Sequence, residues 1–552
     1  MHSIKSRIIA IFVIAVIVAG GVFVALSGMQ IRFPEPSDEN GNATSYAIGK
    51  DTINIWYTDE ALTDYLNYVA VGYSSVNEDV RVVPTLVSGL DYMEGISEAS
   101  MTDEGLPDLY ITTNDMLEKA HLAGLAETIA PPDAVDITSL FPQMAIDSVT
   151  YKDNLTAYPL FMECSAMCIN YTYLEQWARN TLESEIRAQM AEEAKEKEAE
   201  AEANKTADSD NKTDSDKKED SDNKDSDNKD EEEKTEEAVD VSSMVSDEEV
   251  AAYVEERLPS SIDTLLALSD DFDAPEKVDT IFKWAVTDIF YNYFFIGDSI
   301  DIGGECGDDI DKIDIYNLDA ILGLTTYQKL NQFFSISTDD VSYGGVIEDF
   351  ENGRIVMTIV TTDAVKTLAD AKAEAAEETR GAEDAEGTVD FEYKFLPLPD
   401  ISETADGRSM SVTDCVVVNG YSSQKEAAND FAYYLCTSDP AALYEWTGKV
   451  SPLSGADLGA HNDELQVFLN EYDESIPLPK MLETSNYWVN LEMLFASVWD
   501  GADANKGLKD LSEQMKLQAT GKRISEETIE IPVEEEEDEG EFIDDSSEEA
   551  GE

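Results

Sequence analysis

Three short segments in the first third of the chain end in side chains that suit hydrogen bonding to a small polar molecule. They are Tyr57-Thr58-Asp59, Thr112-Thr113-Asn114-Asp115 and Phe161-Met162-Glu163. Ionised carboxylates accept strong hydrogen bonds from hydroxyl and N–H donors. Glu163 stands out because a carboxylate within an apolar strand is costly to bury without partners. We therefore expect Glu163 to face a ligand, whereas Asp115 could also start the helix that follows it.

The chain around these segments alternates between strand-like and helical patterns. The apolar pieces are Ile53–Tyr57, Val80–Val87, Pro107–Asp115, Gly124–Ile129 and Thr156–Asn170. Short β-rich runs separated by helical stretches indicate parallel βαβ units. In open α/β sheets, ligands bind beyond the carboxyl ends of the strands. Because the three short segments fall at or near such ends, the pattern predicts a small-molecule cleft in an α/β protein.

The later part of the chain continues this alternation. Strands are predicted at Arg354–Val360, Phe391–Pro399 and Val412–Val418, and helices at Leu324–Ile336, Thr361–Ala376, Ser422–Leu435, Leu482–Trp499 and Gly507–Ala519. Ser261 is predicted to cap a further helix. The aromatic residues of Ile281–Gly297 are expected to belong mainly to the core.

The charge balance excludes several partners. The 552 residues include 37 Lys and Arg against 118 Asp and Glu, a net charge of −81, of which 188–249 and 529–552 contribute −29. Such an acidic surface argues against binding to nucleic acid or anionic lipid. The Asp-Ser-Asp-Asn-Lys repeats have no apolar face and are predicted to be disordered. Five cysteines and three histidines suggest neither a disulfide framework nor a zinc site, so no cofactor is expected.

The N-terminus carries an uncharged apolar segment, Ile8–Leu26, after the basic residues Lys5 and Arg7. Its length of about 19 residues is near the span of a bilayer, and the flanking charges predict that the rest of the chain lies outside the membrane. Ala25-Leu26-Ser27 also fits a secretory cleavage site. We favour an uncleaved anchor over a cleaved signal. Pro34–Lys50 would then be a flexible tether.

Six short motifs, in this order, resemble the extracellular solute-binding proteins of ABC importers, in the branch related to maltose-binding protein. They are Pro107-Asp108-Leu109-Tyr110; Ala123-Gly124-Leu125; Tyr151-Lys152-Asp153 with Ala157-Tyr158-Pro159; Ile169-Asn170-Tyr171; Phe350 to Met357; and Ser422 to Ala428. The resemblance runs from about Ile53 to Met515 and is interrupted by the acidic insertion.

The resemblance implies a two-lobed α/β fold whose cleft closes on a solute by hinge motion, in a monomer that delivers the solute to a permease. The predicted parts are 1–32 (anchor), 33–50 (tether), 51–160 and 390–443 (lobe one), 161–389 and 444–519 (lobe two, with the insertion 188–249), and 520–552 (tail).

The resemblance also assigns binding roles. Asp115 and Glu163 match carboxylates that accept hydrogen bonds from sugar hydroxyls, and Trp488 matches an aromatic platform for a sugar ring. The residues themselves add the candidates Thr58, Asp59, Tyr291, Tyr343 and Tyr487, and the resemblance adds Asp363. Thr112 and Met116 stand where maltose binders carry a tryptophan and an arginine, and Asp363 stands near a second stacking tryptophan. The pocket is thus more acidic, which leaves another sugar or a cationic solute open.

Two other functions stay open at this point. Glu163 and Asp115 could form a glycosidase pair, which requires two carboxylates about 5–9.5 Å apart. We do not expect an enzyme, because no other catalytic motif is present. The protein could instead be a sensor or surface protein that has kept the fold without transport.

Overall fold

The computed structural model describes residues 51–102, 105–132, 135–209, 241–338, 341–378, 389–402 and 404–532. All described residues after Asp51 belong to one compact unit. The predicted anchor Ile8–Leu26, the predicted tether Pro34–Lys50, half of the acidic insertion and most of the tail lie outside the described residues. Among the helices of the described ranges, none is both long and apolar enough to cross a membrane.

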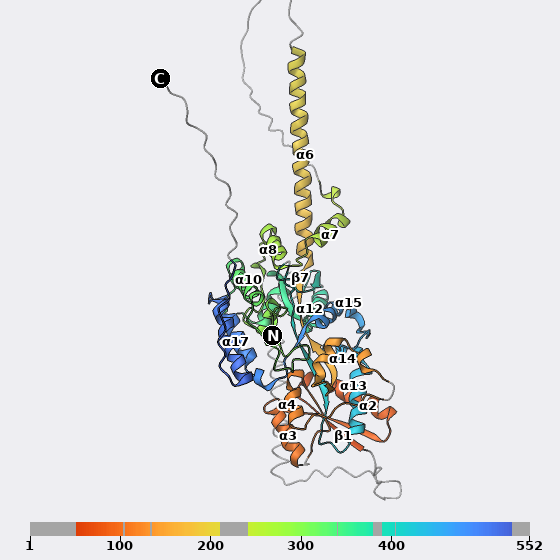
Figure 1. Cartoon of the computed structure of the whole chain (residues 1–552). Coiled ribbons are helices and arrows are strands. Elements are labelled where there is room, and N and C mark those ends of the chain that lie inside the picture. Colours follow the sequence, from red (N-terminus) through yellow and green to blue (C-terminus); the bar gives the residue numbers. More distant parts are fainter. Residues whose placement is uncertain are drawn as a thin grey trace, which may run out of the picture. The chain divides into compact units, whose positions relative to one another are not determined.

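The first part of the fold is a six-stranded sheet, seen in Figure 1 among the red and orange elements. It contains β1 (Asp51–Tyr57), β2 (Val80–Leu86), β3 (Leu109–Thr113), β6 (Tyr158–Glu163), β13 (Met410–Val418) and β14 (Ile476–Pro477). The order is β14-β13-β3-β1-β2, with β6 also pairing with β13. β1 and β3 are parallel, whereas β13 runs antiparallel to β3 and β6. The carboxyl ends of the parallel strands β1 and β3 therefore lie at the same edge of the sheet.

A second, four-stranded sheet has the order β12-β7-β11-β8. Its strands are β7 (Ser165–Asn170), β8 (Thr280–Phe282), β11 (Ile355–Thr361) and β12 (Tyr393–Leu396). Every residue of β11 is buried, as its continuous apolar pattern predicts. Short antiparallel pairs are formed by β4 (Thr150–Tyr151) with β5 (Asn154–Leu155) and by β9 (Asp301–Ile302) with β10 (Ile313–Asp314).

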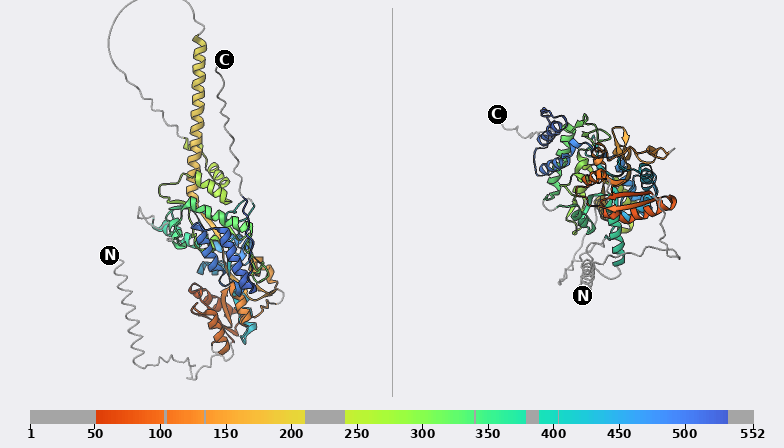
Figure 2. Two further views of the ribbon diagram at one scale, coloured as in Figure 1. Left: turned by 60° about the vertical axis from the view of Figure 1, so that its left-hand side comes forward. Right: turned by 90° about the horizontal axis from the view of Figure 1, so that it is seen from below.

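Helices surround both sheets, and Figure 2 shows the first-sheet elements at one end and the green elements of the second at the other. The helices near the first sheet are α2 (Thr63–Val76), α3 (Tyr92–Thr102), α4 (Leu117–Leu122), α5 (Gln143–Val149), α13 (Lys425–Thr437) and α14 (Pro440–Thr447). The others are α6 (Tyr171–Ser209), α7 (Asp247–Glu256), α8 (Ile262–Asp271), α9 (Ile289–Asn292), α10 (Leu318–Phe334), α11 (Tyr343–Glu351), α12 (Asp363–Glu378), α15 (Asn462–Glu474), α16 (Tyr487–Trp499) and α17 (Ala504–Thr520).

Several local predictions are confirmed. Ser261 caps α8 in a capping box with Thr264. The aromatic residues between 281 and 297 are core residues: Trp284 is fully buried and meets Trp499 edge-on at 5.5 Å between ring centroids. A further finding is that α6 continues from Tyr171 into the acidic insertion, where its side chains from Ala188 to Lys197 are exposed.

Three predicted elements are wrong in detail. Thr156–Asn170 is not one strand, because the chain leaves the first sheet after β6 and enters the second as β7; Cys164 lies between them. Gly124–Ile129 forms no strand, since the positive φ of Gly124 (71°) begins an irregular segment. The predicted helix Leu482–Trp499 is divided into a short 3-10 turn and α16.

The lobe boundaries stay a prediction, and two strands lie across them. β12 falls in the range predicted for lobe one but pairs with β7 in the four-stranded sheet. β14 falls in the range predicted for lobe two but pairs with β13 in the six-stranded sheet. The chain therefore passes between the two sheets more often than the predicted boundaries allow.

Candidate functional site

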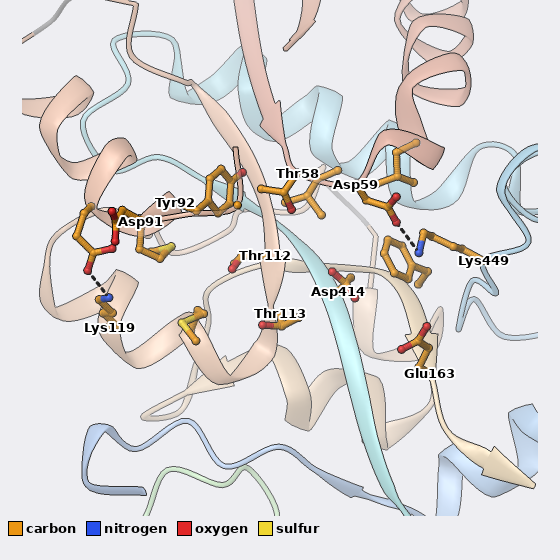
Figure 3. A pocket seen from close by; sticks show the side chains of 17 residues that line it. Thr58, Asp59, Asp91, Tyr92, Thr112, Thr113, Lys119, Glu163, Asp414 and Lys449 are labelled. Carbon is orange, nitrogen blue, oxygen red and sulfur yellow. Dashed lines mark hydrogen bonds and ion pairs between the residues drawn. The ribbon is translucent and has the colours of Figure 1, made fainter. Parts of the chain in front are cut away.

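A cavity of about 480 Å³ lies at the edge where β1, β3 and β6 end (Figure 3). The polar residues that line it come from separate elements. Thr58 and Asp59 follow β1, Thr112 and Thr113 end β3, Glu163 ends β6, Asp414 lies in β13, and Lys449 follows α14. On the other side, Asp91 precedes α3, Glu94 lies in α3 and Lys119 lies in α4. A second cavity of about 220 Å³ shares Phe161, Glu163 and Lys449 with the first and adds Asp363 and Lys366 from the region after β11. The combined site is thus built from both sheets.

Asp59 and Lys449 form an ion pair at the wall shared by these elements. Asp59 Oδ2 lies 2.7 Å from Lys449 Nζ, and Asp59 Oδ1 accepts a hydrogen bond from the N–H of Ala61 at 2.9 Å. Burial opposes ionisation of Asp59, but the hydrogen bonds from Lys449 and Ala61 outweigh it, and its pKa is lowered. Lys449 Nζ also lies 4.5 Å from the ring centroid of Phe161. Lys449 is therefore held in place by an anion and an aromatic face.

Glu163 and Asp414 face the cavity without such partners. Among the described residues, neither side chain accepts a hydrogen bond or forms an ion pair, and Figure 3 places both on the side of the cavity where Lys449 lies. Burial raises the pKa of Glu163, with Asp363 and Asp59 adding to the effect against Lys449. Burial likewise raises the pKa of Asp414, to about 7, with Glu163 among the carboxylates that contribute. Two carboxylates thus offer unused acceptors to a ligand.

Asp115 lies near the site but not among the residues that line either cavity. It belongs to the 3-10 turn Asn114–Met116 that follows β3, and its carboxylate accepts a hydrogen bond from the hydroxyl of Thr113. Burial raises its pKa. The alternative role considered for Asp115, at the start of the following helix, agrees with this position. Its role in ligand binding stays a prediction.

Tyr291, Tyr343 and Asp363 form a cluster beside the second cavity. The two tyrosine rings stack at 4.9 Å between centroids and 17° between planes. Tyr343 Oη donates to Asp363 Oδ1 at 2.8 Å and accepts from the N–H of Thr361 at 3.2 Å. Of these three predicted residues, only Asp363 lines the second cavity. Tyr343 therefore holds the carboxylate of Asp363 in position, and Tyr291 supports the ring of Tyr343.

Tyr487 and Trp488 lie elsewhere, in helix α16. Tyr487 is buried, and Trp488 packs against Tyr293 and Tyr487 at centroid distances of 5.7 and 5.0 Å. Neither residue lines the two cavities. The stacking role given to Trp488 rests on the resemblance alone and stays a prediction.

Asp414, Lys449 and Phe161 are site residues that the sequence predictions missed. Asp414 carries the same signal as Glu163, a carboxylate within an apolar strand, and could have been found by it. Lys449 follows Gly448, which ends α14 in a left-handed conformation, and no sequence pattern marks it. Among the described residues no group of His, Cys, Asp and Glu is arranged to hold a metal ion.

Comparison with known proteins supports the fold. No family model matches the chain, and no curated protein sequence matches it. Solved structures do match. A cyclo/maltodextrin-binding protein complexed with maltotetraose has a TM-score of 0.58 and 16% identity over 86% of this chain and 99% of its own. An extracellular solute-binding protein from Staphylococcus aureus in complex with maltose has a TM-score of 0.57 and 14% identity over 84% and 96%.

A third structure, the maltose-binding periplasmic protein of Listeria monocytogenes in complex with maltose, has a TM-score of 0.56 and 16% identity over 86% of this chain and 99% of its own. The chain therefore has the two-lobed α/β fold of solute-binding proteins. Within that class it resembles the maltose-binding proteins, as the sequence motifs predict.

Proposed function

We propose that this protein is an extracellular solute-binding protein of an ABC importer that captures a carbohydrate. One observation carries the proposal: the cavity at the strand ends is lined by Glu163 and Asp414, whose carboxylates have no partner among the described residues. Sugar hydroxyls are donors that such acceptors bind well. The position agrees with the general rule for ligands in open α/β sheets, and the named structural neighbours bind maltose or maltotetraose.

Capture would proceed by movement of the two sheet regions toward each other. The first cavity is lined mainly by elements of the six-stranded sheet, and the second adds Asp363 and Lys366 from the region after β11. Because both cavities share Glu163 and Lys449, a bound solute would contact both parts of the protein. Closure would then bury the solute, and a permease would take it from the closed form. The N-terminal segment Ile8–Leu26 would hold this monomer at the outer face of the membrane.

The glycosidase alternative receives less support. Glu163 lines the cavity, whereas Asp115 does not and is already engaged by Thr113. A pair of carboxylates that acts on one glycosidic bond must face the same space. The predicted pair of Glu163 and Asp115 is therefore not formed, and we favour binding because the named structural neighbours are binding proteins. Glu163 and Asp414 do share the cavity, and an assay for sugar release from oligosaccharides tests whether they act as a catalytic pair.

A thermal-shift screen of the full-length protein tests the proposal. The panel holds monosaccharides, oligosaccharides, amino acids and polyamines. A ligand present at 100 times its dissociation constant adds about 2.7 kcal/mol to the folded state. That corresponds to a rise in Tm of roughly 5–10 °C for a domain of ordinary size. We expect a sugar to give this shift and Glu163→Ala to abolish it. If an amino acid or a polyamine shifts Tm and no sugar does, the solute is not a carbohydrate. If no member of the panel shifts Tm, a sensor or structural role is favoured over transport.

A further inference from the structure

The charged residues that line the two cavities are not balanced. Each lysine is already paired with a carboxylate: Lys119 with Glu94 at 2.7 Å, Lys449 with Asp59 at 2.7 Å and Lys366 with Asp370 at 3.1 Å. Asp363 accepts hydrogen bonds from Tyr343 and Thr361. Asp91, Glu163 and Asp414 remain without a side-chain hydrogen-bond or ion-pair partner in the part of the chain that the structure describes. Asp91 is exposed and lies on the side of the first cavity where Lys119 lies, whereas Glu163 and Asp414 lie together on the side of Lys449 (Figure 3).

The strands explain why these two carboxylates lie near each other. Asp414 pairs in register with Phe161 of β6 on one side and with Thr113 of β3 on the other, and Glu163 pairs with Val412 of the same strand β13. A break in the register of β13 with β6 falls immediately after Asp414. The adjacent strands β6 and β13 therefore each place one carboxylate in the same cavity, and the sheet holds both in position.

A neutral sugar would use the acceptors of these carboxylates but would leave their charges uncompensated. Two like charges held close together in a partly buried site each resist ionisation. Burial is the largest cause of the raised pKa of both groups, Glu163 adds to the rise at Asp414, and Asp363 and Asp59 add to the rise at Glu163. A protonated amine supplies both N–H donors and the missing positive charge.

We propose that the solute is an amino sugar, whose protonated amine binds between Glu163 and Asp414 while its hydroxyl groups contact the rest of the cavity. The inference rests on the proposed carbohydrate-binding function and names the chemical class of the carbohydrate. The threonines Thr58, Thr112 and Thr113 line the same cavity and provide hydroxyl partners for the sugar ring.

Isothermal titration of the full-length protein tests this assignment. The ligands are glucosamine, galactosamine, mannosamine and glucosamine oligomers, each against its N-acetylated counterpart, together with maltotriose and spermidine. N-acetylation removes the charge and keeps the ring. We expect at least one free amine to bind about tenfold or more tightly than its acetylated form, the effect of losing one charge-assisted contact.

The outcomes separate this inference from the proposed function. Equal or tighter binding of the N-acetylated sugar or of maltotriose would overturn the amino-sugar assignment and leave carbohydrate binding in place. Binding of spermidine without any sugar, or of no member of the panel, would overturn both.

Matched variants locate the amine. Asp414→Asn and Glu163→Gln are each expected to weaken binding of the free amine by about tenfold and to reduce its advantage over the acetylated sugar. Glu445→Gln is the control, because it makes the same charge change at an exposed position of the neighbouring helix α14. Lys449→Met is expected to act in the opposite direction and tighten amine binding, since it leaves Asp59 uncompensated. A loss of selectivity for the amine in Glu445→Gln, or none in the two cavity variants, would refute the placement.

Discussion

The substitution Asp414→Asn should stabilise the empty protein at alkaline pH. The carboxylate of Asp414 faces Glu163, Asp59 and Asp115, and Lys449 is the cation that opposes them. Its pKa is about 7 in the folded protein against an ordinary value of 3.8, with burial as the largest cause. The folded state therefore holds this proton more tightly than the unfolded chain does. The contribution of Asp414 to the free energy of unfolding therefore falls as pH rises from 3.8 to 7 and stays constant above 7.

The magnitude follows from the two pKa values. They differ by about 3, and a difference of one corresponds to about 1.36 kcal/mol, so ionised Asp414 costs at most about 4 kcal/mol at pH 8. The side chain faces an open cavity in which water screens the charge, which reduces the expected cost to about 2 kcal/mol. Asparagine keeps the shape and cannot ionise. The variant should therefore be more stable than the original protein by about 2 kcal/mol at pH 8 and by about 1 kcal/mol or less at pH 5.

Urea denaturation at pH 5, 6.5 and 8, followed by tryptophan fluorescence and far-UV circular dichroism, measures this difference. The free energy of unfolding of Asp414→Asn minus that of the original protein should rise with pH. Glu445→Gln should show no such trend, because its carboxylate is exposed on α14. If Asp414→Asn is less stable at pH 8, or if its effect does not change with pH, the reasoning about uncompensated charge in the cavity is wrong.

Two further predictions concern stability. Lys449→Met should lower the free energy of unfolding by about 1 kcal/mol at pH 7, because it removes the ion pair with Asp59, whose side chain is 39% exposed. The lowered pKa of Asp59 means that this stabilisation is present above pH 3.8 and lost as the carboxylate is protonated below it, so an acid titration of the same variant should show the effect vanish. Gly323→Ala should cost roughly 1–3 kcal/mol, since a Cβ there would lie 2.0 Å from the carbonyl oxygen of Phe295. Gly344→Ala, in a helix position with open space, should instead be neutral or stabilising by about 0.5–1 kcal/mol, and equal urea midpoints for the two alanine variants would contradict both values.

Local patterns in the sequence predict the individual elements well. The apolar run Arg354–Val360 becomes the buried strand β11, and Ser261 caps α8, because burial of a continuous apolar run and a capping hydroxyl act over a few residues. The run Thr156–Asn170 shows the limit. β6 and β7 are equally apolar, and nothing local marks the passage from one sheet to the other at Cys164.

The site is predicted only in part for the same reason. Glu163 is found because an acid in an apolar strand is costly unless it has a use, and Thr58 and Asp59 are found because they follow a strand. Lys449 reaches Asp59 from a position far away in the sequence, so only the folded chain reveals their ion pair. Trp488 is assigned by resemblance alone: its ring packs against Tyr293, and its role as a platform for a sugar ring stays a prediction.

Binding of the full-length protein to an array of neutral, N-acetylated and amino glycans, repeated with Glu163→Ala and with Glu445→Gln, tests most directly whether this cavity binds a carbohydrate. We predict that at least one glycan binds the original protein and Glu445→Gln but not Glu163→Ala. Absence of glycan binding, or glycan binding that survives Glu163→Ala unchanged, would contradict the assignment of the cavity as a sugar site.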